Sequence, residues 1–99
     1  MSISNRYFVR EKDLVTRTIA GETIIVPVKN NVGDLDSIYA LNEVGSTIWE
    51  LIDGKNSIVQ IVEVVCDVYD VTSEVAKEDI SDFLSTLETS GLIRLSSER

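Results

Sequence analysis

The sequence predicts an α+β domain in which a small three-stranded antiparallel sheet is followed by three helices and a short terminal strand. Two runs rich in β-branched residues flank a glycine-containing turn between residues 14 and 28. Three segments with apolar residues three and four positions apart follow between residues 41 and 90, and a short apolar run occupies 92–95. A length of 99 residues fits one domain, so residues 1–99 are taken as a single unit.

The strands are predicted from residue type and turn chemistry. Residues 14–19 and 23–28 form a hairpin because the glycine between them can take the positive φ of a tight turn. Pro27 has no N–H to donate, so the second strand either ends near it or has a free edge there. Residues 29–34 have the composition of a loop, and a third short strand is expected at residues 36–41.

The helices are predicted from their caps as well as their periodicity. Residues that cap helix N-termini precede the three periodic segments: Asn42, Ser57 and Thr72. Gln60 follows Ser57 at the spacing of a capping box. Gly54 is expected to end the first helix as a left-handed cap, and Gly91 to close the third. Gly45, inside the first helix, costs about 1 kcal/mol relative to alanine and indicates the close passage of another backbone.

Most apolar helical residues are assigned to the core. On the third helix this applies to Ile80, Leu84 and Leu87. Trp49 lies one step from the main apolar stripe of the first helix, where the core edge is the simpler interpretation and ligand stacking the alternative. Cys66 stands among valines and is expected to be a small buried hydrophobe.

The composition argues against catalysis. The chain has no histidine and one cysteine, so it lacks the commonest general acid–base group and metal ligand, and it cannot form an internal disulfide. Serines have no histidine beside them to act as a base. Asp79 and Asp82 share a helix face, which is more often a solvated surface than a metal site. We expect no catalytic residue, no metal and no cofactor.

The charge distribution narrows the classes of partner. The net charge is -8, and it is uneven: residues 1–33 carry five basic and three acidic side chains, whereas residues 34–99 carry four basic and fourteen acidic ones. This acidic balance opposes binding to nucleic acid phosphates or to an anionic membrane surface. A solvated helix surface explains the acidic half, and steering of a basic partner is the sharper hypothesis.

The N-terminal residues lack the basic start and apolar run of a signal peptide. No segment approaches the roughly 20 apolar residues that span a bilayer. A cytoplasmic location without membrane contact is therefore the default expectation, and a free cysteine agrees with it.

The third predicted strand is the best candidate for binding. At a sheet edge it would have unpaired N–H and C=O groups, with which an extended peptide can pair while its alternate side chains fill adjoining pockets. The third helix would supply the other wall. The alternative is that this edge is simply covered, and the residues themselves leave both interpretations open.

Three segments together resemble the PqqD-like family. They are Leu-Asn-Glu-Val-Gly-Ser-Thr-Ile-Trp-Glu-Leu-Ile-Asp-Gly at 41–54, Ser-Ile-Val-Gln-Ile-Val at 57–62, and Asp-Ile-Ser-Asp-Phe-Leu-Ser-Thr-Leu-Glu-Thr-Ser-Gly-Leu-Ile at 79–93. The hairpin with Thr16-Arg17 and Gly21-Glu22-Thr23 also fits small stand-alone members. The resemblance covers roughly residues 14–95, and its specificity comes from the order and spacing of the motifs.

The resemblance implies a winged helix-turn-helix-like recognition element for ribosomally made, post-translationally modified peptides. Such domains bind the leader region of a precursor peptide and present the peptide to a modifying enzyme, often a radical SAM enzyme. The leader adds as an antiparallel strand to the third strand, in a groove against the third helix. Carried onto this sequence, the implied peptide-binding residues are Ser37, Ile38, Tyr39 and Ala40 on the strand, and Asp79, Phe83 and Thr86 on the helix.

Two other functions compete with peptide recognition. A winged-helix DNA binder is disfavoured because the second and third helices are strongly acidic, the wrong sign for phosphate contact. A structural or regulatory partner of a larger enzyme, with no peptide substrate, is not separated from a peptide-binding protein by anything in the chain. An exposed edge strand on a small domain is also compatible with a homodimer, including a strand-swapped one.

Overall fold

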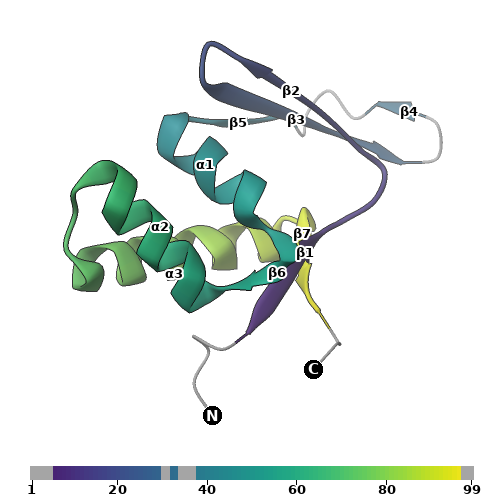
Figure 1. Cartoon of the computed structure of the whole chain (residues 1–99). Coiled ribbons are helices and arrows are strands. Elements are labelled where there is room, and N and C mark those ends of the chain that lie inside the picture. The colour runs from purple at the N-terminus through teal and green to yellow at the C-terminus, as the bar shows by residue number, and fades with distance from the viewer. Residues whose placement is uncertain (1–5, 30–31, 34–37, 97–99) are drawn as a thin grey trace.

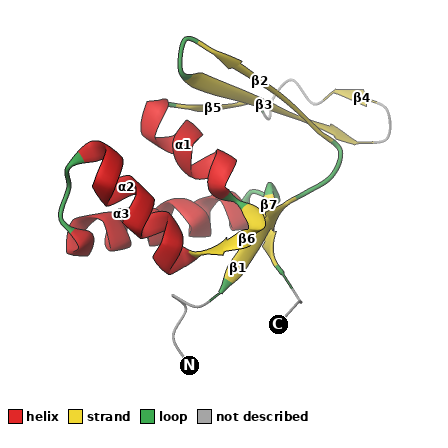
Figure 2. Ribbon diagram, in the orientation of Figure 1, coloured by secondary structure: helices red, strands yellow, loops and turns green. Residues whose placement is uncertain are grey.

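The computed structural model describes residues 6–29, 32–33 and 38–96. Within these ranges it has two small sheets and a group of three helices (Figure 1; Figure 2). In chain order the elements are β1 (Tyr7–Arg10), β2 (Leu14–Ile19), β3 (Glu22–Lys29), β4 (Val32–Gly33), β5 (Tyr39–Leu41), α1 (Glu43–Leu51), β6 (Asp53–Ser57), α2 (Ile58–Tyr69), α3 (Ser73–Thr89) and β7 (Ile93–Leu95). The predicted α+β class is confirmed.

The predicted three-stranded antiparallel sheet is formed by β2, β3 and β5. β2 pairs with one edge of β3 along its whole length, and β5 pairs with β3 at residues 23–25. The hairpin lies above α1 in Figure 1, and the inward side chains of Thr23 and Ile25 are fully buried. The segment predicted as a loop contains β4, which pairs with the end of β3.

Pro27 lies inside β3, so the strand does not end there. The N–H of Val28 donates to the carbonyl of Asp13 (2.8 Å), which directs Val28 toward β2. Because N–H groups alternate between the two sides of an antiparallel strand, the missing donor of Pro27 falls on the opposite edge. That point lies between the residues paired with β5 and those paired with β4. Among the residues that the structure describes, none pairs with β3 at this point, as the free-edge alternative predicts.

A second sheet, in the order β6-β1-β7, lies beside the helices and was not predicted. Because of this sheet, Gly54 is a strand residue and not the helix cap that the sequence predicted. Helix α1 ends at Leu51 with Ile52 as its C-cap, and Gly54 takes a positive φ of 80° within β6. The Asp53 carboxylate accepts hydrogen bonds from the backbone N–H groups of Lys55 (2.8 Å) and Asn56 (3.1 Å). The first of these bonds is the main reason why the pKa of Asp53 is lowered.

The other predicted caps are confirmed. Side-chain oxygens of Asn42, Ser57 and Thr72 accept from backbone N–H groups in the first turn of α1, α2 and α3, and Ser57 and Gln60 form the reciprocal capping box. After α3, Gly91 has a φ of 81° and donates to Glu88 O at 3.0 Å. The next N–H, of Leu92, donates to Leu87 O at 3.0 Å, which completes a Schellman motif.

The core joins the helices to the inward faces of both sheets. The third-helix residues Ile80, Leu84 and Leu87 are buried in it, as predicted. Trp49 is 2% exposed, and the Arg10 guanidinium lies 5.7 Å from its ring centroid. Trp49 is therefore a core residue, and the ligand-stacking alternative is wrong because its ring is covered. Cys66 is only half-buried against this core.

Two glycines provide a matched test of the second sheet. A Cβ at Gly54 would lie 2.8 Å from Val9 Cγ1, whereas a Cβ at Gly91 would meet nothing within 4 Å, and both glycines have nearly the same positive φ. We expect Gly91→Ala to lower the free energy of unfolding by about 1 kcal/mol through backbone strain alone. Gly54→Ala should cost at least about 1 kcal/mol more because of the overlap with Val9. Urea denaturation measures both; equal losses would contradict the packing of β6 on β1.

Candidate functional site

The backbone of β5 has one paired and one open edge among the described strands. Within the described residues, β3 is the one strand that pairs with β5. The backbone N–H of Val28 points toward β2, so every second residue of β3 faces β2 and the residues between them, including Thr23 and Ile25, face β5. Tyr39 and Leu41 are paired with Ile25 and Thr23, and they are therefore the β5 residues whose backbone groups bond to β3. The N–H and C=O of Ala40, between them, point away from the sheet. This residue is exposed, so its backbone groups are available to another extended chain.

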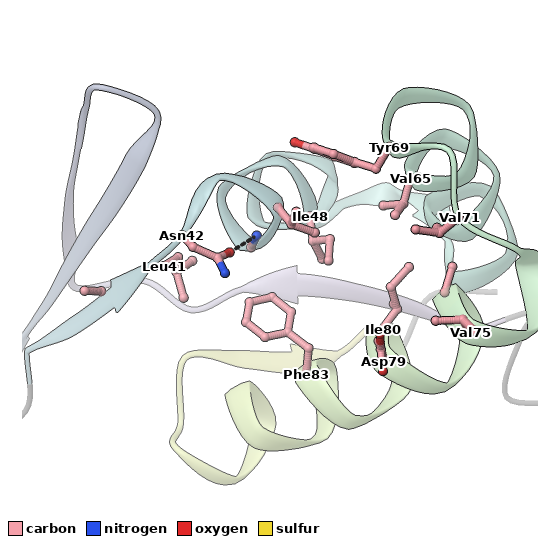
Figure 3. A pocket seen from close by; sticks show the side chains of 14 residues that line it. Leu41, Asn42, Ile48, Val65, Tyr69, Val71, Val75, Asp79, Ile80 and Phe83 are labelled. Atoms are coloured by element: carbon pink, nitrogen blue, oxygen red, sulfur yellow. Dashed lines mark hydrogen bonds between the residues drawn. The ribbon is translucent and has the colours of Figure 1, made fainter.

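A groove of about 430 Å³ opens at the end of β5 (Figure 3). Its walls come from β5 with the following Asn42, from α1, from the end of α2 and the connection after it, and from α3. Among the described residues the lining is mostly apolar, with Asp79 as the one charged side chain: Ala40, Leu41, Asn42, Val44, Gly45, Ile48, Val65, Tyr69, Val71, Val75, Ala76, Asp79, Ile80 and Phe83. An apolar groove beside an open strand edge is suited to an extended peptide.

The end of the groove next to β5 is closed by an aromatic ring. A Cβ at Gly45 would lie 3.3 Å from Phe83 Cζ and 3.3 Å from Leu41 Cβ. The glycine in α1 thus admits the half-buried ring of Phe83 against the helix. The prediction that another backbone passes Gly45 is wrong, because side chains occupy this space.

The opposite wall is held by a hydrogen bond between helices. The hydroxyl groups of Tyr69 on α2 and Thr47 on α1 lie 2.7 Å apart, and the Tyr69 hydroxyl also donates to the Glu43 carbonyl at 3.4 Å. These contacts tie the C-terminal end of α2 to α1. Beyond them, Val71 and Val75 are 39% and 51% exposed, so the groove leaves apolar surface open to solvent.

The structure brings together part of the predicted peptide-binding set. Ala40, Asp79 and Phe83 line the groove, from β5 and α3. Tyr39 points inward and is half-buried against the core, while Ile38 precedes β5 and is 49% exposed. Thr86 is exposed on α3, one turn beyond Phe83, and does not line the groove. Ser37 lies outside the described residues.

The far half of the groove was missed by sequence reasoning. It includes Tyr69, Val71 and Val75, and Val44 near the start of α1 was missed as well. Periodicity alone assigns apolar residues of these helices to the core, yet Val44 is 37% exposed here. The sequence did indicate Val75: it precedes Asp79 by four residues, so it lies on the same face of α3, one turn closer to the N-terminus.

The described residues hold no cluster of three or more His, Cys, Asp or Glu side chains that could bind a metal ion. No helix in the described ranges is both long enough and apolar enough to cross a bilayer.

Fold and site define a small α+β domain with an apolar groove beside an open strand edge. Residues 22–93 match the family described as coenzyme PQQ synthesis protein D (PqqD), and the chain belongs to this family. This confirms the resemblance that the sequence motifs indicated. The matched region contains β3, β5 and all three helices, and therefore the whole groove.

A solved structure shares the fold. The protein TbiB1, in complex with the TbiA(beta) leader peptide, superposes with a TM-score of 0.73 at 24% sequence identity. The similarity covers 92% of this chain and 98% of that chain. No curated protein matches the sequence.

Proposed function

We propose that this protein is a non-catalytic recognition element that binds the leader region of a ribosomally made precursor peptide. The leader adds as an antiparallel strand to β5 and lays side chains into the groove. The observation that carries the proposal is the outward N–H and C=O of Ala40 beside that groove. Membership of the PqqD family and the fold shared with a leader-peptide complex support it.

The proposed interface has a backbone part and a side-chain part. β5 and the preceding Ile38 provide the strand edge, with Ala40 as its outward hydrogen-bonding position. Phe83 provides an apolar contact and Asp79 a charge on the facing helix. Thr86 extends this face past the groove and would touch only a peptide that continues along α3.

The bound peptide is then presented to a modifying enzyme, for which a radical SAM enzyme is our first candidate. This step takes place in the cytoplasm, where precursor peptides are synthesised. A homodimer is compatible with it only if pairing between copies leaves the β5 edge open to the leader.

Amide NMR titration with leader peptides of precursors encoded near this gene tests the proposal. We expect the largest shift changes at residues 38–41 and along α3, with small changes in the β6-β1-β7 sheet. Changes confined to other surfaces, or none with any such peptide, would favour a structural or regulatory partner without a peptide substrate.

Salt should weaken leader binding. Residues 34–99 carry a net charge of -10 and include both walls of the groove, so a basic leader is attracted to this half of the molecule. Raising the salt from 50 to 500 mM shortens the Debye length severalfold, and we expect the Kd to rise by about threefold or more. Calorimetry at several salt concentrations measures this; a Kd unaffected by salt would remove the electrostatic contribution and leave strand addition.

A further inference from the structure

Three side chains on α3 form a row along the groove. Val75, Asp79 and Phe83 are spaced four residues apart, and all three line the cavity. Figure 3 shows Phe83 next to Leu41 and Asn42, with Asp79 and then Val75 farther from β5. The row thus offers an apolar, an acidic and a second apolar contact in succession.

The spacing of this row matches that of an extended peptide. Four residues of α-helix rise about 6 Å. Two residues of β-strand rise about 6.7 Å, and alternate side chains of a strand point to the same side. A strand running along α3 therefore places every second side chain opposite one member of the row. A peptide residue opposite Leu41 points to the inner face of the sheet, as Leu41 does, and so faces Phe83.

The charge of Asp79, the middle member of the row, favours one kind of peptide side chain opposite it. Asp79 is exposed, and no ion pair joins it to another residue in the part of the chain that the structure describes. The neighbouring α3 carboxylates, Glu78 and Asp82, add to the negative potential. The lysine of this helix, Lys77, lines a different surface depression, with Glu63 and Glu74. A cationic side chain is therefore the favoured partner of Asp79.

We propose, on the basis of the proposed function, that the groove recognises a five-residue pattern in the leader: apolar, any residue, Lys or Arg, any residue, apolar. Asp79 is the residue that selects the basic side chain. The two apolar side chains pack at Phe83 and at the Val71 and Val75 end of the groove. The pattern reads the same in both chain directions, so it does not depend on the orientation of the peptide.

A randomised library of 12-residue peptides, selected by mRNA display on the immobilised protein, tests this pattern without knowledge of the natural leader. We expect Lys and Arg to be enriched at least threefold between apolar residues two positions away on either side. Asp79→Asn should lose this enrichment while keeping the apolar positions. Asp79→Lys should replace it with Asp and Glu, and should bind a selected lysine peptide at least tenfold more weakly.

Glu88→Lys is the matched control, because Glu88 is exposed on the same helix, nine positions from Asp79, and does not line the groove. It should select the same peptides as the unaltered protein. Peptides that bind without a basic preference, or that keep it on Asp79→Lys, would overturn the pattern and leave the proposed function standing. Failure of the unaltered protein to select any peptide would instead overturn the proposed function, and the pattern with it.

Discussion

Ala40→Pro is expected to weaken leader binding strongly while the domain stays folded. The N–H of Ala40 points away from β3, so proline removes a donor that no bond to β3 uses. Proline is tolerated at such edge positions, and it favours an extended conformation for the preceding Tyr39. The incoming peptide, however, loses the central N–H donor, and the ring projects into the space that its backbone would occupy.

The expected loss of affinity is large because the peptide carbonyl is left without a donor. An unsatisfied buried acceptor costs about 1–3 kcal/mol, which corresponds to a roughly 5- to 150-fold increase in Kd. Isothermal titration calorimetry with a leader peptide measures it, and urea denaturation tests the fold. We expect the free energy of unfolding to change by less than about 1 kcal/mol.

Thr16→Pro is the matched control for this experiment. Thr16 lies on β2, the other edge strand of the sheet formed with β3, and the same alternation points its N–H away from β3. The substitution therefore perturbs an outward edge in the same way but away from the groove. Equal losses of affinity in both variants, or unchanged binding by Ala40→Pro, would show that the peptide does not add to β5.

Local signals were sufficient for the hairpin and the helices. The capping residues Asn42, Ser57 and Thr72 act within one helical turn, and the β2–β3 turn depends on residues next to each other in the sequence. The strands β1 and β6 were missed for the opposite reason. β1 pairs with residues more than 80 positions away in β7, and the sequence of β6, Asp-Gly-Lys-Asn-Ser, has the composition of a turn.

The candidate site, like the fold, has a part that the sequence indicated and a part that depends on tertiary packing. The order of the strands allowed an open edge at the third strand but left a covered edge equally open, and the α3 face followed from spacing and from the family resemblance. The exposed apolar part of the lining could not be predicted, because the sequence shows that Val44 and Val75 are apolar but does not show what covers them. Their exposure depends on how α1, α2 and α3 pack, which leaves the space between their ends open.

Phe83→Ala is expected to weaken leader binding at least tenfold. The ring is half-buried, lines the groove next to β5 and contacts α1 at Gly45. Aromatic side chains at the centre of an interface are common hot spots, with losses of about 2 kcal/mol or more on truncation. Because the ring is only partly buried, the stability loss should stay below the 3–5 kcal/mol typical of a fully buried phenylalanine.

Leu87→Ala separates affinity from stability. Leu87 is buried on α3, one turn beyond Phe83, and does not line the groove. Its truncation should cost about 2–5 kcal/mol of stability, yet the fraction that remains folded should bind the leader with nearly unchanged affinity. Denaturation and calorimetry on both variants should therefore rank them in opposite orders. If affinity instead followed stability in both, Phe83 would contribute only to the core, and the apolar contact with the leader would have to lie elsewhere in the groove.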